Sequence, residues 1–175
     1  MNEFFNAKNI AKIALFASLA FIISLLEFPL FPQAPFLKLD FSNVFILIGG
    51  FSLGPVSGFI ILLIKELLCL LKTTTYVGQI ANLIIGLSYI LLPTIYYHYK
   101  KGIKGVIITL SIASIMQVVA GLLVNRFINF PLYGLTVAVF YEMLIFIVLF
   151  NFIKAIGIGA VTLLLYKRIK KVLHI

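Results

Sequence analysis

The sequence predicts an all-α integral membrane protein in which residues 1–175 form a single domain of six transmembrane helices. Of the 175 residues, 63% are hydrophobic and only 11% are charged, whereas about a quarter of the residues of a soluble domain are charged. The hydrophobic residues fall into long runs, several of them near or above the ~18–20 residues that cross a bilayer. The basic residues are grouped between these runs.

The net charge of +9 is concentrated at the ends of the apolar runs. Most of the 14 lysines and arginines form three clusters: Lys8 and Lys12; Lys100, Lys101 and Lys104; and Lys167, Arg168, Lys170 and Lys171. Cytoplasmic ends of membrane helices carry such an excess of Lys and Arg. The clusters therefore predict a multi-pass protein of the cell membrane with both termini in the cytoplasm, and they argue against nucleic-acid binding.

The first predicted helix covers residues 10–28, where a proline-rich stretch follows that cannot continue a helix. The next apolar run, 41–71, is too long for one ordinary span. We expect it to break at Gly54-Pro55 into helices 42–53 and 55–71, the former only about 18 Å long at 1.5 Å per residue. With this break, all three basic clusters fall on the same side of the membrane.

The remaining predicted helices cover 77–97, 104–125 and 149–166. The segment 126–148 is apolar but contains Pro131 and Gly134. It is either a folded outer loop with a short helix or a seventh hydrophobic segment. A seventh full span would place the C-terminal cluster outside, so we favour the loop.

Small residues repeat at four-residue spacing on the first helix, which places each pair on one helix face. These residues are Ala7 and Ala11, and Ala14 and Ser18. In lipid, small faces let helices approach closely. The face either packs inside the bundle or docks a partner subunit, and the sequence leaves both open.

Polar side chains lie at membrane depth, where they are costly and face a cavity, a partner or water. We single out Lys65 with Glu66, Gln79 with Asn82, Asn125, and Asn151 with Lys154. For Lys65-Glu66 we favour a structural role, with Glu66 toward the interior and Lys65 reaching for an interface. Lys154 either donates to a ligand or extends to the outer surface. The others lie near outer helix ends, as does the connection 28–41, so we expect one outward-facing pocket with aromatic walls.

Several stretches resemble the riboflavin-specific S components of energy-coupling factor (ECF) transporters. The most specific is 31–42, which contains Leu-Lys-Leu-Asp-Phe-Ser. It is followed in the same order by 48–58, 77–86, 129–134 and 151–155, so that the resemblance covers nearly the whole chain. The chain departs from the family pattern at Asn43 and Phe45, where an acid and a proline are common, and at Gln79, where Glu is frequent.

The resemblance implies six helices, an outward-facing vitamin site, and a complex with a membrane coupling protein (EcfT-like) and two cytoplasmic ATPase subunits. Riboflavin would be the transported substrate, and no cofactor is implied. The implied substrate-binding residues are Asp40, Gln79, Asn82, Asn125, Asn151 and Lys154. The connection 28–41 would act as a lid, with Phe31, Phe36, Lys38 and Leu39. The small-residue face of the first helix would dock the coupling protein, and the subunit would reorient in the membrane.

Other function classes lack their usual residues. The sequence has no G-x-x-x-x-G-K-[ST] phosphate loop, and its single cysteine, Cys69, predicts neither a disulfide framework nor a Cys-rich metal site. Both histidines lie near basic clusters, and the glutamates at 27, 66 and 142 are far apart in the chain. We therefore expect no enzyme activity. The alternatives are an S component for another small vitamin-like substrate and, in a different class, a small channel or scaffold protein.

Overall fold

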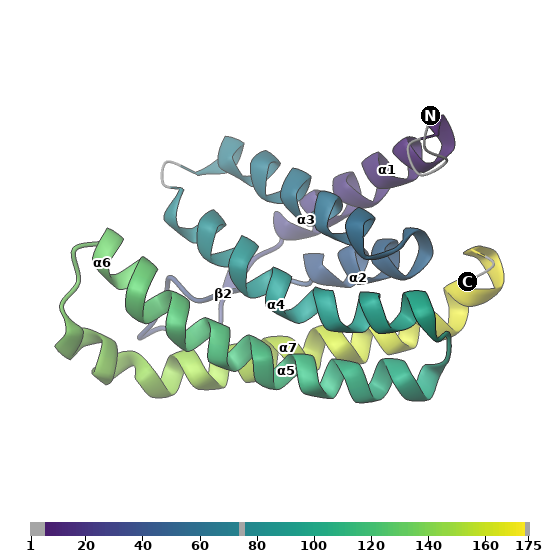
Figure 1. The fold of residues 1–175 in the computed structure, drawn as a ribbon. Coiled ribbons are helices and arrows are strands. Elements are labelled where there is room, and N and C mark those ends of the chain that lie inside the picture. The colour runs from purple at the N-terminus through teal and green to yellow at the C-terminus, as the bar shows by residue number, and fades with distance from the viewer. Residues whose placement is uncertain (1–5, 74–75, 174–175) are drawn as a thin grey trace.

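The computed structural model describes residues 6–73 and 76–173, and within them four stretches are long and apolar enough to cross a membrane. They are α1 (Ala7–Ser24), α4 (Val77–Tyr99), Ile103–Leu132, and the part of α7 (Val137–Leu173) that ends at Tyr166. The third begins with α5 (Ile103–Val124). Helix α5 packs between α4 and α7, and α1 packs on the two shorter helices α2 and α3. The protein is a bundle of membrane helices (Figure 1).

The predicted break at Gly54-Pro55 is confirmed. Helix α2 (Ser42–Leu53) ends at Gly54, and α3 (Pro55–Cys69) begins at once with a proline, which suits a first helical turn. Gly54 has φ +95°, a conformation that side chains with a Cβ rarely adopt. The two helices approach closely, since a Cβ on Gly58 would lie 3.3 Å from the Cα of Gly50. A 3₁₀ turn, η2 (Leu70–Lys72), extends α3.

The predicted outer loop at 126–148 is wrong. Helix α5 continues through a π-helical turn, η3 (Asn125–Asn129), into the short α6 (Phe130–Leu132). The chain then reverses at 133–136, and α7 begins at Val137 rather than at 149. Pro131 lies in the short α6, directly after the π-helical turn. The turn needs only Gly134 at φ +68°. The segment therefore adds a tight turn at the end opposite the turn between α4 and α5, and no seventh span (Figure 1).

The connection 28–41, the predicted lid, contains a two-stranded antiparallel hairpin that the sequence did not predict. Strand β1 (Phe28–Pro29) pairs with β2 (Lys38–Leu39), with Phe28 opposite Leu39 and Pro29 opposite Lys38. Helix α1 also ends four residues before the predicted boundary at 28. Between the strands, buried lid side chains join a second apolar core with residues of α6 and α7: Ala34, Leu37, Leu39, Phe130, Phe140, Ile147 and Phe150.

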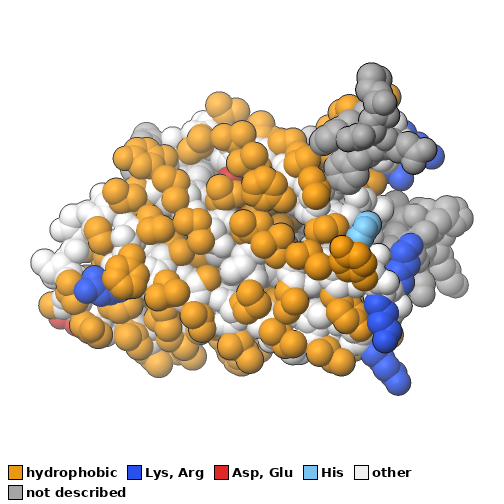
Figure 2. Space-filling view, in the orientation of Figure 1, with side chains coloured by type: hydrophobic (Ala, Val, Ile, Leu, Met, Phe, Trp, Pro, Cys, Tyr) orange, Lys and Arg blue, Asp and Glu red, His pale blue; other side chains and the backbone are white. Residues whose placement is uncertain are grey.

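The two ends of the bundle differ in charge. The start of α1, the turn between α4 and α5, and the end of α7 lie at one end (Figure 1). Lysines gather at this end, whereas hydrophobic side chains cover most of the rest of the face in view (Figure 2). The side chains of the predicted cluster at 167–171 lie outside the described residues. Exposed apolar residues such as Ile108, Ile115 and Leu164 fit a surface in contact with lipid.

The small-residue face of α1 is exposed. Ala7, Ala11, Ala14 and Ser18 all lie on the surface, whereas the side of α1 that packs in the core includes Phe16 and Ala20. Of the two alternatives for this face, internal packing does not agree with the structure. The face remains accessible to a partner.

Candidate ligand-binding site

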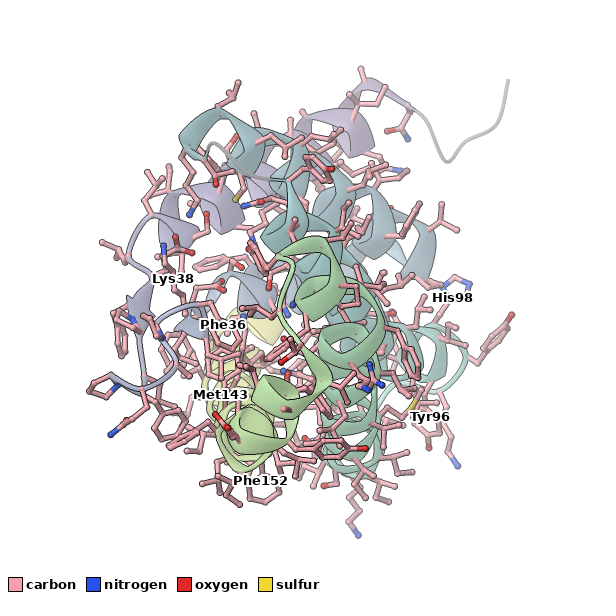
Figure 3. All side chains as sticks on the ribbon, turned by 90° about the vertical axis from the view of Figure 1, so that its left-hand side faces the viewer. Phe36, Lys38, Tyr96, His98, Met143 and Phe152 are labelled. Atoms are coloured by element: carbon pink, nitrogen blue, oxygen red, sulfur yellow. The ribbon has the colours of Figure 1, made fainter. Side chains whose placement is uncertain are left out.

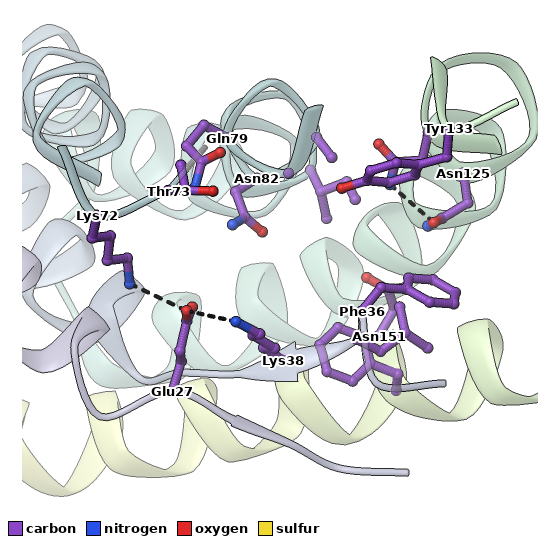
Figure 4. Close-up of a pocket in the computed structure, with 16 residues that line it drawn as sticks. Glu27, Phe36, Lys38, Lys72, Thr73, Gln79, Asn82, Asn125, Tyr133 and Asn151 are labelled. Atoms are coloured by element: carbon purple, nitrogen blue, oxygen red, sulfur yellow. Dashed lines mark hydrogen bonds and ion pairs between the residues drawn. The ribbon is translucent and has the colours of Figure 1, made fainter. Parts of the chain in front are cut away.

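A cavity of about 220 Å³ lies at the end of the bundle opposite the turn between α4 and α5 (Figure 1 and Figure 3). Figure 4 shows this cavity in close-up. Its walls come from the predicted lid and the residue before it, from η2 and the connection to α4, from α4 and η3, from the turn after α6, and from α7. Figure 3 views the protein from this end, with Phe36 and Lys38 labelled on the lid. Side chains distant in sequence thus share one chamber: the amides Gln79, Asn82, Asn125, Asn129 and Asn151, and the aromatic rings of Phe36, Tyr133 and Phe150.

The π-helical turn positions two of the amides. Asn125 donates to the Gly121 carbonyl at 2.7 Å, and Asn129 donates to Asn125 Oδ1 at 3.0 Å. Single π turns inside α-helices often mark functional sites, because the extra residue turns side chains that would otherwise point elsewhere. The helix does not end at Asn125, because it continues through η3 into α6. Asn125 is a buried side chain within this continuous helix.

Helix α7 presents Asn151 to the same chamber. Its amide donates to the Ile147 carbonyl at 2.9 Å, which fixes the side-chain orientation. Gly121 of α5 makes room for it, because a Cβ at this position would overlap the Asn151 amide. The contact between α5 and α7 thus depends on a glycine directly beside a predicted ligand residue.

A smaller polar cavity, of about 10 Å³, lies next to the first and shares Asn82 and Ile85 with it. Here Lys154 of α7 donates to Asp40 Oδ2 at 2.9 Å, and both side chains are over 90% buried. The other oxygen, Asp40 Oδ1, accepts from the Ser42 N–H at 2.9 Å and from the Ser42 hydroxyl. The ion pair therefore connects the end of the lid to the middle of α7, and Lys154 does not extend to the outer surface.

Lys65 and Glu66 also border the smaller cavity. Lys65 Nζ donates to Glu66 Oε1 at 2.8 Å, and both residues are buried. The expected structural pairing of neighbours agrees with this geometry. The expectation that Lys65 reaches for an interface is wrong, because the Lys65 side chain is only 3% exposed. The Lys65 side chain folds inward, where the carboxylates of Glu66 and Asp40 attract its ammonium group.

Of the six predicted substrate-binding residues, four border the larger cavity and two the smaller one. Gln79, Asn82, Asn125 and Asn151 belong to the first group, and Asp40 and Lys154 to the second, with Asn82 bordering both. The structure brings them together at one end of the protein. Their role as ligands to a substrate stays a prediction.

Two of the four predicted lid residues border the larger cavity, and the other two pack elsewhere. Phe36 and Lys38 border the larger cavity. Phe31 instead packs against Phe146, with ring centroids 5.4 Å apart, and Leu39 is buried in the second core. These two residues pack against the bundle and do not border the larger cavity.

Sequence reasoning missed several wall residues, among them Asn129, Tyr133, Phe150, Glu27 and Lys72. A signal existed for Asn129, which follows Asn125 by four residues and so falls on the same helix face. The sequence carried no such signal for Glu27 and Lys72, because their proximity arises from a tertiary contact between η2 and the connection that follows α1.

The chemistry of the larger cavity favours an uncharged, partly flat ligand. Its amides each offer a donor and an acceptor, and its rings offer apolar faces. The charged groups Glu27, Lys38 and Lys72 lie close to one another (Figure 4). Among the described residues, no group of three or more His, Cys, Asp or Glu side chains could hold a metal ion.

Comparison with known proteins assigns the family. The model of the family described as "ECF transporter, substrate-specific component" matches residues 8–166. The chain belongs to this family. It is a membrane protein and a substrate-binding transporter subunit rather than an enzyme.

Named relatives cover most of the chain. The riboflavin transporter RibU of Staphylococcus aureus is 35% identical over 170 residues, which are 93% of this chain and 90% of the relative. The riboflavin transporter FmnP of Bacillus subtilis is 30% identical, over 72% of this chain and 68% of the relative. A solved S component of a bacterial ECF transporter superposes with a TM-score of 0.84 at 36% identity, covering 95% of this chain and 97% of that one.

Proposed function

We propose that this S component captures riboflavin at the outer face of the cell membrane and delivers it for import. The observation that carries the proposal is the convergence of amides from α4, η3 and α7 with three aromatic rings in one cavity beneath the lid. The names of the relatives, riboflavin transporters from two organisms, support the choice of substrate.

Riboflavin suits the chemistry of this cavity. Its isoalloxazine ring system is flat and uncharged, and carries donors and acceptors along one edge. Stacking against Phe36, Tyr133 or Phe150 would use the faces of the ring. Asn125 and Asn151 would pair with its polar edge, and Lys154, just below, would donate to a carbonyl oxygen. Gln79 and Asn82 would bind the ribityl hydroxyls, and Asp40 would hold Lys154 in position.

The distribution of basic residues indicates which end of the protein faces outward. The positive-inside rule places the basic end, with Lys8, Lys12, Lys100, Lys101 and Lys104, in the cytoplasm. Both termini then lie in the cytoplasm, six helices cross the membrane, and the cavity faces outward. The lid over the cavity, with Phe31, Phe36, Lys38 and Leu39, would separate a bound vitamin from the outside.

Energy for import would come from partners. Since the sequence contains no phosphate loop, two cytoplasmic ATPases and an EcfT-like coupling protein would supply it. The exposed face of α1 formed by Ala7, Ala11, Ala14 and Ser18 suits the coupling protein, because small side chains permit close helix contact in lipid.

A fluorescence titration tests the proposal. Riboflavin fluorescence should be quenched stoichiometrically by the protein purified in detergent, with Kd in the nanomolar range or below, about −12 kcal/mol. Absence of quenching at micromolar protein would contradict riboflavin binding. Displacement of the flavin by an excess of a different vitamin would instead indicate an S component for that substrate. An Asn151→Leu variant serves as the negative control.

A further inference from the structure

One carboxylate connects three segments beside the larger cavity. Glu27, at the start of the lid, lies with its Oε1 atom 3.2 Å from Lys38 Nζ on β2 and 3.4 Å from Lys72 Nζ on η2 (Figure 4). Lys72 also donates to the Ser24 carbonyl at 2.8 Å, at the end of α1. All three charged side chains border the cavity. We call this group the Glu27 clasp.

The other side of the lid is held by apolar contacts. Phe36 packs edge-on against Phe130 of α6 at 5.8 Å, and Phe31 packs against Phe146 of α7 at 5.4 Å. Between them, Ala34 and Leu37 are buried in the second core. The lid therefore has an ionic edge toward α1 and η2, and an aromatic edge toward α6 and α7.

We propose that the lid opens at the Glu27 clasp and pivots on its aromatic edge, and that Glu27 is a positioning residue that sets the rate of ligand release. This inference rests on the proposed function only in its use of riboflavin as the ligand. Glu27 directly precedes β1 and Lys38 lies on β2, so both move with the hairpin, whereas Lys72 remains tied to Ser24 when the clasp opens. The Glu27–Lys72 pair is then the contact that breaks first.

The two edges differ in their response to salt. Side-chain exposure at the clasp is 51% for Lys38, 25% for Glu27 and 21% for Lys72, so ions from the solvent reach it. Between about 0.01 M and 1 M salt the Debye length falls from ~30 Å to ~3 Å, which screens exposed charges. Buried apolar contacts are not weakened in this way. Riboflavin itself is uncharged at neutral pH, so salt acts on the protein.

Stopped-flow release of riboflavin across this salt range tests the proposal. We expect release from the unmodified protein to quicken about two- to tenfold at high salt, the range that two exposed ion pairs allow. The Glu27→Gln variant should release at the fast rate in both conditions. Glu142→Gln removes the same charge from an exposed site on α7 outside the cavity, and it should keep the salt dependence. Phe31→Ala should speed release and also keep the salt dependence.

Slow, salt-dependent release from Glu27→Gln would overturn the clasp. A second measurement needs no ligand: hydrogen exchange of residues 28–39 should quicken in Glu27→Gln at low salt, and in the unmodified protein at high salt. Unchanged exchange in both cases would likewise overturn it. If the unmodified protein fails to bind riboflavin, the proposed substrate is wrong, and the exchange measurement still decides whether the clasp exists.

Discussion

The Lys154–Asp40 ion pair gives the sharpest test of how this site is built. Lys154 Nζ lies 2.9 Å from Asp40 Oδ2, and the two side chains are 8% and 4% exposed. The pair connects positions 114 residues apart, one on α7 and one just before α2. Replacing Lys154 by Met keeps most of the side-chain volume and removes the charge. Asp40 would then be a buried carboxylate without its main partner.

Breaking a buried ion pair from one side costs about 3–5 kcal/mol of unfolding free energy. Lys65 also interacts electrostatically with Asp40 and would remain, so we expect a loss near 3 kcal/mol. The double variant Asp40→Asn/Lys154→Met leaves no unpaired charge and should regain most of this loss. It should not regain riboflavin affinity, because the proposed Lys154 hydrogen bond to the ligand stays absent.

Denaturation in mixed detergent measures the stabilities, and fluorescence quenching measures the affinities. Lys104→Met, which removes an exposed charge at the basic end, is the control and should match the unmodified protein. The reasoning fails if Lys154→Met unfolds within about 0.5 kcal/mol of the unmodified protein, the range of ordinary surface substitutions. It also fails if the double variant is no more stable than the single one.

Two further substitutions separate binding from assembly. Gly121→Ala should displace the Asn151 amide and weaken riboflavin binding about ten- to a hundredfold, from 1–3 kcal/mol of overpacking. Ala160→Val, which adds bulk at an exposed site on α7 outside the cavity, is its control in the same titration. If Gly121→Ala bound riboflavin as tightly as this control, the steric argument would be refuted. Ala11→Leu, on the exposed face of α1, should reduce co-purification with an EcfT-like coupling protein about tenfold or more while the affinity for riboflavin stays unchanged. Full recovery of the complex would exclude this face as the docking surface, and Ile108→Phe on the exposed side of α5 controls for added bulk.

Local chemistry determined which parts of the fold were predictable. The break between α2 and α3 was predicted because Gly54 and Pro55 impose it within two residues. The segment 126–148 was mispredicted because Pro131 and Gly134 suggested a long irregular loop. In the structure the proline lies in the short α6 and the glycine in a short reversal. Where proline and glycine mark a boundary, they do not say how many residues it occupies, and Pro93 marks none because α4 runs through it.

The site was predictable in composition but not in contacts. Polar residues at membrane depth pointed to Asn125, Asn151 and Lys154, and all three are buried at the same end of the bundle. The partners of these residues depend on long-range packing. The pairing of Lys154 with Asp40, and that of Glu27 with Lys72, join segments that are distant in sequence and have no local signature.

A crystal structure of the protein with riboflavin tests the central claim most directly. We predict one flavin in the cavity beneath the lid, with its polar edge within hydrogen-bond distance of Asn125 and Asn151 and its ring against Phe36, Tyr133 or Phe150. A flavin bound elsewhere on the protein, or a cavity that stays empty at saturating riboflavin, would contradict the account.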